Sequence, residues 1–118
     1  VTFYGWRSSD FIKNKLSKAD IFILPSWEEG FPNALVEALA SGLCVITTNV
    51  GTISDYISNY KNGIYFEPKN KFSLSNALKL VLNDFNLMSS LSKSGYLLAK
   101  EKFNTEIAVN KIIKAVDL

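Results

Sequence analysis

The chain has 118 residues, of which 47% are hydrophobic and 20% charged, and its 13 basic and 11 acidic side chains leave a net charge of +2. It contains no histidine, which excludes Ser-His-Asp and Cys-His nucleophile pairs and histidine metal ligands within the chain. The single cysteine excludes an intrachain disulfide and a cysteine-rich zinc site. Carboxylates, ammonium groups, hydroxyls and backbone amides remain, and they suit the binding of phosphates and polyols better than acyl transfer.

The length suffices for one hydrophobic core and not for two, so we expect a single domain over residues 1–118. The weak, scattered positive charge indicates neither a nucleic-acid footprint nor a polybasic membrane anchor. No apolar run approaches the length of a membrane span, and the start has no pattern of a secretion signal. We therefore expect a soluble, cytoplasmic chain. Because Val1 already begins a strand-like segment, we also expect it to be the back part of a longer protein.

Short apolar segments of strand length alternate with helical patterns along the first part of the chain. In chain order they predict strands at 1–4, 21–24, 43–47 and 64–66, and helices at 9–17, 32–41 and 52–57. This alternation predicts an α/β fold, a Rossmann-like parallel sheet flanked by helices, with right-handed crossovers. Residues 21–24 are continuously apolar, as expected of a strand covered on both faces. From 71 to 118 the pattern is purely helical, with Asn104 or Thr105 as the cap of the last helix.

Residues 25–42 carry most of the chemical information. Pro32 suits the first position of a helix and Gly42 the position just past its end, so we expect a helix of about ten residues between them. Asn33, Glu37 and Ser41 recur every four residues and form one polar stripe. The other positions of this helix are apolar, which predicts that it is largely buried.

The start of this helix is a candidate ligand site. Helical side chains lean toward the amino end, so Glu37 points toward the loop that carries Glu29 and Gly30. Free N–H groups and the positive end of the helix dipole favour a phosphate there, while an ionised carboxylate can accept two hydrogen bonds from a diol. A nucleotide sugar carries both groups. The alternative is that Glu29 and Glu37 are solvated surface residues.

The segments Ala19–Ser26, Glu29–Asn33 and Glu37–Gly42 closely resemble the donor-binding half of retaining glycosyltransferases of the GT-B fold, family 4. The E-x7-E pair of that family would be Glu29 and Glu37. The resemblance continues in order through residues 45–47, Gly51, Asn62-Gly63 and Pro68, and so covers almost the whole chain.

The resemblance implies a role for each matching residue. Glu37 would hold the ribose hydroxyls, and Glu29 would approach the donor sugar as the catalytic carboxylate. The other substrate-binding residues would act through their backbone. The sugar and the diphosphate would be lined by Gly30, Phe31 and Asn33, and the base would be contacted by Gly5 and Trp6.

The same resemblance implies a function for a longer protein. The donor would be a nucleotide sugar, most simply UDP-linked, and the acceptor a glycan or a lipid-linked sugar in bacterial surface polysaccharide biosynthesis. Transfer would retain configuration, with no metal and no cofactor, because the protein stabilises the charge of the departing diphosphate. The acceptor would bind to a missing N-terminal domain, the fragment alone would be inactive, and the full-length protein could associate peripherally with the inner face of the membrane.

Two departures from the family pattern stand out. Relatives commonly have a glycine pair followed by Glu, whereas this chain has a single glycine at Gly51, then Thr52 and the shorter Asp55. The basic pair that relatives use on the diphosphate would lie upstream of the first residue, and Arg7 is not its positional equivalent.

Other interpretations of the whole chain stay open. It could be a nucleotide-binding module without activity of its own, or part of a GT-B sugar epimerase. A flavodoxin-like receiver would require an acidic cluster after its first strand, which is not seen. The adjacent Glu28 and Glu29 do not indicate a glycosidase pair, because neighbouring side chains rarely converge.

Three further residues have local interpretations. Cys44 lies within a predicted strand and is expected to be a buried, inert thiol. Trp6 and Trp27 each follow a predicted strand, so either ring is a candidate for stacking on a base or a sugar. Lys69 and Lys71 are most simply parts of a solvated turn.

Overall fold

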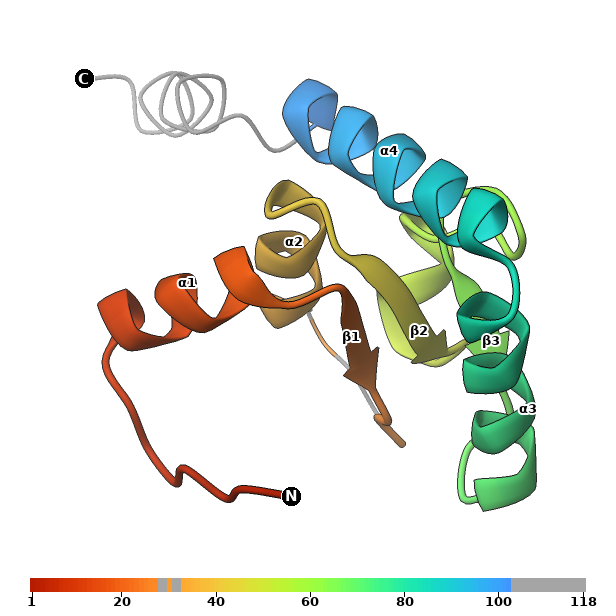
Figure 1. The fold of residues 1–118 in the computed structure, drawn as a ribbon, viewed down its shortest axis with the longest axis horizontal. Coiled ribbons are helices and arrows are strands. Elements are labelled where there is room, and N and C mark those ends of the chain that lie inside the picture. Colours follow the sequence, from red (N-terminus) through yellow and green to blue (C-terminus); the bar gives the residue numbers. More distant parts are fainter. Residues whose placement is uncertain (28–29, 31–32, 103–118) are drawn as a thin grey trace.

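The computed structural model describes residues 1–27, 30 and 33–102. A parallel sheet of three strands in the order β1-β2-β3 forms its centre (Figure 1). Its strands are β1 (Ile21–Leu24), β2 (Cys44–Thr48) and β3 (Ile64–Phe66). The helices are α1 (Ser9–Lys18), α2 (Asn33–Ala40), the 3-10 helix η1 (Gly51–Asp55), α3 (Lys71–Leu82) and α4 (Phe85–Lys102). The prediction of a parallel α/β fold is confirmed.

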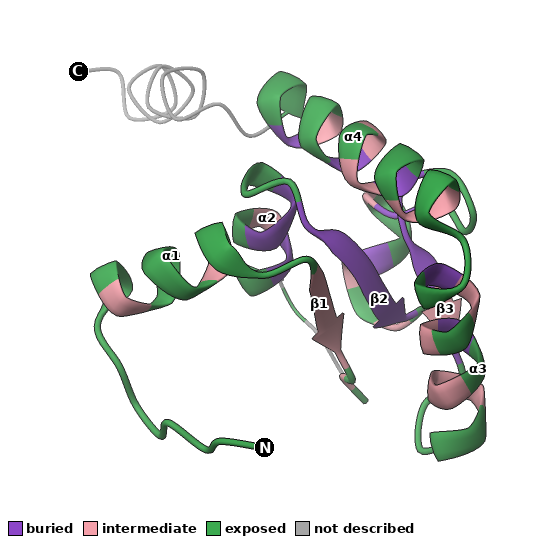
Figure 2. Cartoon of the chain, in the orientation of Figure 1, coloured by how far each residue is buried: buried purple, intermediate pink, exposed green. Residues whose placement is uncertain are grey.

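Strand β2 is the centre of the packing, and all five of its residues are buried (Figure 2). Its side chains alternate between two hydrophobic clusters, as the pleat of a strand requires. Val45 packs with residues of α2 and η1, whereas Cys44 and Ile46 pack with β3 and α3. Helix α4 contributes to both clusters, with Ala99 in the first and Leu91 in the second. The sheet is therefore covered on both faces at β2.

Strand β1 is less covered than the sequence predicts. All four of its residues are half-buried. Among the described residues it has a hydrogen-bonded neighbour on one side alone, which is β2. A continuous apolar run such as Ile21–Leu24 thus identifies the strand but not the number of its neighbours.

The predicted strand at 1–4 is wrong for this structure. Residues 1–8 form neither helix nor strand, and the segment lies apart from the sheet (Figure 1). Phe3 is 94% exposed. A strand requires a hydrogen-bonded neighbour for its backbone, and within the described residues no strand lies beside this segment.

The ends of the other elements agree closely with the sequence patterns. Gly42 has a φ of +76°, the left-handed conformation that glycine adopts easily at the end of a helix. The segment predicted as a helix at 52–57 is a shorter 3-10 helix, Gly51–Asp55, which begins one residue earlier and ends two residues earlier. Helices α3 and α4 confirm the helical pattern from residue 71 to 102, whereas Asn104 and Thr105 lie outside the described residues.

Cys44 is buried, as expected, and burial raises the pKa of its thiol to about 11. The thiol is therefore protonated at neutral pH, and since the thiolate is the reactive form, Cys44 is a packing residue.

Two threonine hydroxyls tie the end of β2 to the end of β1 and to the loop that follows it. The Thr47 hydroxyl donates to the carbonyl oxygen of Leu24 at 3.1 Å, and the Thr48 hydroxyl to that of Ser26 at 2.6 Å. Both threonines are fully buried, so each hydroxyl needs an internal acceptor. The loop that leaves β1 is thus fixed to the central strand.

Replacing Thr48 with valine keeps the shape of the side chain and removes the donor to Ser26. We expect Thr48→Val to lower the free energy of unfolding by about 1 kcal/mol, the contribution of a typical buried hydrogen bond. Urea denaturation of the two chains measures this difference. Thr48→Ser keeps the hydroxyl and is the matched control for the bond, whereas equal midpoints for Thr48→Val and the unaltered chain would contradict the anchoring role.

Candidate functional site

The loop between β1 and α2 lies at the carboxyl edge of the parallel sheet. In open α/β sheets this edge is where ligands bind, because the strands end there and helices begin nearby. The loop ends at Asn33, the first residue of α2. The amino end of α2 is therefore the candidate site predicted from the sequence (Figure 1).

Helix α2 is buried on one side. Leu35, Ala38 and Leu39 are fully buried, and the predicted polar stripe, including Asn33 and Glu37, is exposed. The expectation that the helix is buried around most of its girth is wrong, since Ala34 and Ala40 are exposed as well. Its buried side packs against β2 and α4.

Glu37 lies one turn after the exposed start of α2, with Asn33 on the same stripe. Among the described residues its carboxylate has no ion-pair partner, which leaves its oxygens available to a ligand. Ser41 does not extend this group, because its hydroxyl donates to the backbone carbonyl of Glu37 at 2.8 Å. Asn33 and Glu37 are thus the members of the stripe whose side chains can meet a ligand, and Glu37 supplies the carboxylate.

A third threonine hydroxyl holds the loop at Gly30. Thr52, in η1, donates to the Gly30 carbonyl oxygen at 2.5 Å. The preceding Gly51 has a φ of +55°, a conformation that favours glycine. Thr52 stands where relatives commonly have the second glycine of a pair, and the sequence alone did not define its role. The structure makes it a residue that positions the loop, whereas Asp55 is exposed at the end of η1.

Several predicted site residues are not brought to α2. Glu29 and Phe31 lie outside the described residues, as do Glu28 and Pro32. Gly5 and Trp6 are described, but their segment lies apart from the start of α2 (Figure 1), and Trp6 is 89% exposed. Their proposed contact with a base stays a prediction.

The N-terminal segment packs instead against α1. The ring of Tyr4 meets that of Phe11 edge-on, with centroids 5.1 Å apart, and the Lys15 ammonium lies 4.9 Å from the centre of the Tyr4 ring. The Arg7 guanidinium lies 5.3 Å from the centre of the Phe11 ring. Arg7 is thus engaged at α1 and is not at the start of α2.

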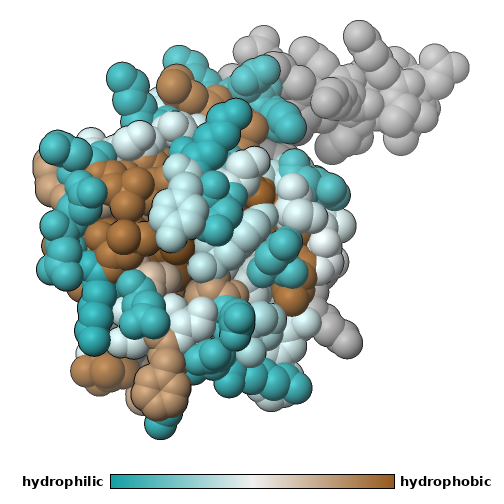
Figure 3. All heavy atoms as spheres, turned by 90° about the vertical axis from the view of Figure 1, so that its right-hand side faces the viewer, coloured by the Kyte–Doolittle hydropathy of each residue, from teal (hydrophilic) through white to brown (hydrophobic). Residues whose placement is uncertain are grey.

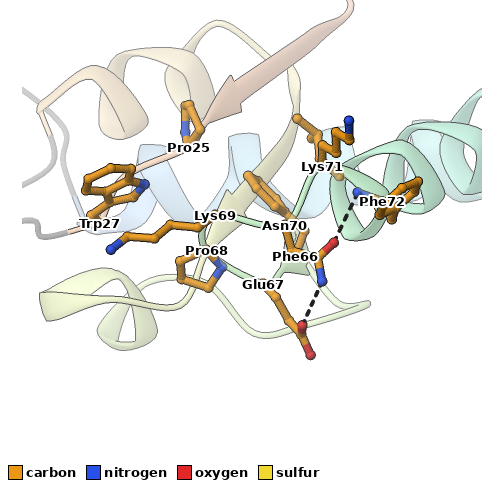
Figure 4. A pocket seen from close by; sticks show the side chains of 10 residues that line it. Pro25, Trp27, Phe66, Glu67, Pro68, Lys69, Asn70, Lys71 and Phe72 are labelled. Atoms are coloured by element: carbon orange, nitrogen blue, oxygen red, sulfur yellow. Dashed lines mark hydrogen bonds between the residues drawn. The ribbon is translucent and has the colours of Figure 1, made fainter.

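Sequence reasoning missed a second feature of the same edge, a hollow of about 760 Å³ between the ends of β1 and β3 (Figure 4). Trp27 lines it from the loop after β1, and Lys69 and Lys71 line it from the turn after β3. The lysines were expected to be solvated. The sequence did indicate Trp27 as a candidate for stacking on a base or a sugar, and the structure places it in the lining of this hollow.

The described residues contain no group of three or more His, Cys, Asp or Glu side chains placed to hold a metal ion. None of their helices combines the length and the apolar character that crossing a membrane requires.

Residues 1–98 match the family model described as glycosyl transferases group 1. The chain is 32% identical over 117 residues to N,N'-diacetylbacillosaminyl-diphospho-undecaprenol alpha-1,3-N-acetylgalactosaminyltransferase of Campylobacter jejuni, covering 99% of this chain and 30% of that protein. It is 34% identical over 108 residues to UDP-Gal:alpha-D-GlcNAc-diphosphoundecaprenol alpha-1,3-galactosyltransferase of Escherichia coli, covering 92% of this chain and 27% of that protein. The chain thus spans about 30% of the length of these relatives.

Among solved structures, the chain is similar to the C-terminal domain of a glycosyl transferase group 1 family protein, LpcC, from Francisella tularensis. The TM-score is 0.78 at 28% identity, over 89% of this chain and 53% of that one. The parallel sheet, the order of its elements and the match over residues 1–98 lead to the same assignment. The chain belongs to the glycosyl transferases group 1 family and has the fold of a GT-B C-terminal domain.

Proposed function

We propose that this chain is the donor-binding part of a retaining glycosyltransferase that transfers a sugar from a UDP-linked donor to a lipid-linked acceptor. The observation that carries the proposal is the position of Glu37, one turn beyond the exposed start of α2 at the carboxyl edge of the sheet. This arrangement offers a phosphate-binding helix end and a diol-binding carboxylate side by side.

The helix end and the carboxylate act on different parts of a nucleotide sugar. The first turn of a helix has backbone N–H groups without partners in the helix, and they point toward the loop. They would donate hydrogen bonds to the diphosphate oxygens and stabilise the charge that develops there when the sugar leaves. Glu37 would accept hydrogen bonds from the two ribose hydroxyls. The bond from Thr52 to the carbonyl of Gly30 would hold the loop beside the sugar.

The relatives support the choice of substrates. The name of the Escherichia coli protein gives a UDP-linked sugar as donor, and both names give an acceptor linked through a diphosphate to undecaprenol. We propose the same classes for this chain, and surface polysaccharide biosynthesis as the process. Because the chain spans about 30% of these relatives, an acceptor domain in other residues of a longer protein would supply the main part of the acceptor site.

Glu29 completes the proposed mechanism as the carboxylate near the donor sugar. In the front-face route that the family resemblance implies, the departing phosphate takes the proton of the acceptor hydroxyl. The new bond then forms on the face that the phosphate leaves, so configuration is retained. The proposal requires no metal, because helix amides and side chains meet the negative charge.

Titration of the labelled chain with UDP tests the donor site. We expect the amide signals of Gly30 and of residues 33–37 to shift in NMR spectra. Glu37→Gln should weaken UDP binding about tenfold, because the amide offers one acceptor oxygen and no charge to the ribose hydroxyls.

Glu101→Gln makes the same substitution at an exposed position of α4 and should leave the affinity for UDP unchanged. ADP should shift these amides less than UDP does. Equal shifts with ADP would contradict the choice of uracil, and no shift with either nucleotide would contradict the site.

Glu29→Ala in the full-length protein tests the catalytic assignment. We expect the rate of sugar transfer to fall by a factor of about 100 or more, the loss typical of a residue that acts on the transition state, while UDP binding changes little. The neighbouring Glu28→Ala is the matched control. Equal losses of transfer and of UDP binding would place Glu29 at the nucleotide and not at the sugar.

A further inference from the structure

The hollow of about 760 Å³ between the ends of β1 and β3 has no role in the donor site described above. Pro25 and Trp27 line it from the loop after β1, and Phe66, Lys69 and Lys71 from the end of β3 and the start of α3 (Figure 4). Its volume is in the range of small-molecule sites, and it lies at the ligand-binding edge of the sheet. Of the described residues that line it, none belongs to the candidate donor group of Gly30, Asn33 and Glu37.

Each end of the hollow pairs an ammonium group with an exposed aromatic ring. The Lys69 Nζ lies 4.2 Å from the centre of the Trp27 ring, and the Lys71 Nζ lies 5.5 Å from the centre of the Phe72 ring. Figure 4 shows Trp27 and Lys69 at one end and Lys71 and Phe72 at the other. Trp27 is 64% and Phe72 71% exposed, so both rings can be reached by a ligand.

The carboxylate that lines the hollow does not neutralise these two lysines. The Glu67 carboxylate accepts a hydrogen bond from the Asn70 side chain at 3.0 Å, and it is turned away from both ammonium groups (Figure 4). Within the part of the chain that the structure describes, neither lysine has an ion-pair partner. The described residues that line the hollow therefore carry two ammonium groups against one carboxylate, a net positive charge.

The backbone of Lys69 is held in an unusual conformation for its residue type. Its φ is +59°, in the left-handed region where glycine is the ordinary choice. Figure 4 shows the side chain running from this turn to the face of Trp27, which comes from the loop after another strand. The turn thus carries the Lys69 ammonium from the end of β3 across to the Trp27 ring.

Aromatic faces beside ammonium groups in a concave site match a phosphorylated carbohydrate. The C–H groups of a sugar ring pack against an aromatic face, and a phosphate accepts charge-assisted hydrogen bonds from lysine. Binding to a membrane surface typically uses the broad apolar face of an amphipathic helix, and not a concave site. The face that carries α3 shows hydrophobic residues scattered among hydrophilic ones (Figure 3). The two lysine-aromatic pairs, in contrast, line the hollow itself.

We propose that this hollow binds the phosphorylated sugar of the acceptor, with Trp27 against the sugar ring and Lys69 and Lys71 at the phosphates. The identification of the ligand as the acceptor rests on the proposed function, because a transferase must hold its second substrate beside the donor. The presence of a sugar-phosphate site does not rest on it, since the hollow and its charges stand on their own geometry.

NMR titration of the labelled chain with glucose 1-phosphate tests the site. The chain has two tryptophans, and a Trp6→Phe variant assigns the indole N–H signal of Trp27. We expect glucose 1-phosphate to shift this signal and the amides of residues 69–72. The double variant Lys69→Gln and Lys71→Gln should bind about tenfold more weakly, because it removes both ammonium groups that could form a charge-assisted contact with the phosphate. Lys61→Gln, at an exposed position before β3, is the matched control and should change nothing.

Titrations with other ligands distinguish the sugar-phosphate site from a site for sugar alone, a site for phosphate alone and a membrane surface. Glucose or inorganic phosphate should bind more weakly than glucose 1-phosphate, and equal binding by either would overturn the combined site. Binding to vesicles of phosphatidylglycerol without any response to glucose 1-phosphate would also overturn it, in favour of a membrane surface. UDP in the same sample should shift the amides of 33–37, so the proposed donor site and this site can fail independently.

Discussion

The complete burial of β2 is the constraint on which the rest of this structure depends. Its apolar side chains unite two hydrophobic clusters, one toward α2 and η1 and the other toward α3. Burial also leaves the hydroxyls of Thr47 and Thr48 without water, so they bond to the backbone at the end of β1 and just after it. The same strand therefore holds the core together and fixes the loop that begins the candidate site.

This anchoring separates two surfaces at one edge of the sheet. On one side the loop leads to α2, where Glu37 and the free helix amides suit a nucleotide sugar. On the other side Trp27 reaches the turn after β3, where the lysines suit a sugar phosphate. Thr52 adds a third bond to the loop, at Gly30. Fixed positions at Ser26 and Gly30 would serve a transfer reaction, because misplacement of either substrate reduces the rate steeply.

Much of this fold could be predicted from the sequence, because periodicity and turn residues report on local structure. The strands Ile21–Leu24 and Ile64–Phe66 have the predicted bounds, and Gly42 ends α2 as expected. The strand predicted at 1–4 failed because strand formation depends on a neighbour, which an apolar run does not reveal. Glu37 could likewise be placed on α2 from its spacing, whereas its exposure depends on which elements cover the helix.

The contacts that shape the site were beyond prediction for a related reason. Lys69 meets Trp27 because β1 and β3 end at the same edge, and Thr52 meets Gly30 because η1 returns to the loop. Neither pair has a spacing that a periodic pattern could detect. Nothing in composition indicates that Lys69 has a positive φ, since the residue type argues against it.

A crystal structure of this chain with UDP tests the central claim most directly. The account predicts the diphosphate at the backbone amides of the first turn of α2, with the ribose hydroxyls on the carboxylate of Glu37. UDP bound elsewhere on the chain, with the start of α2 empty, would contradict it.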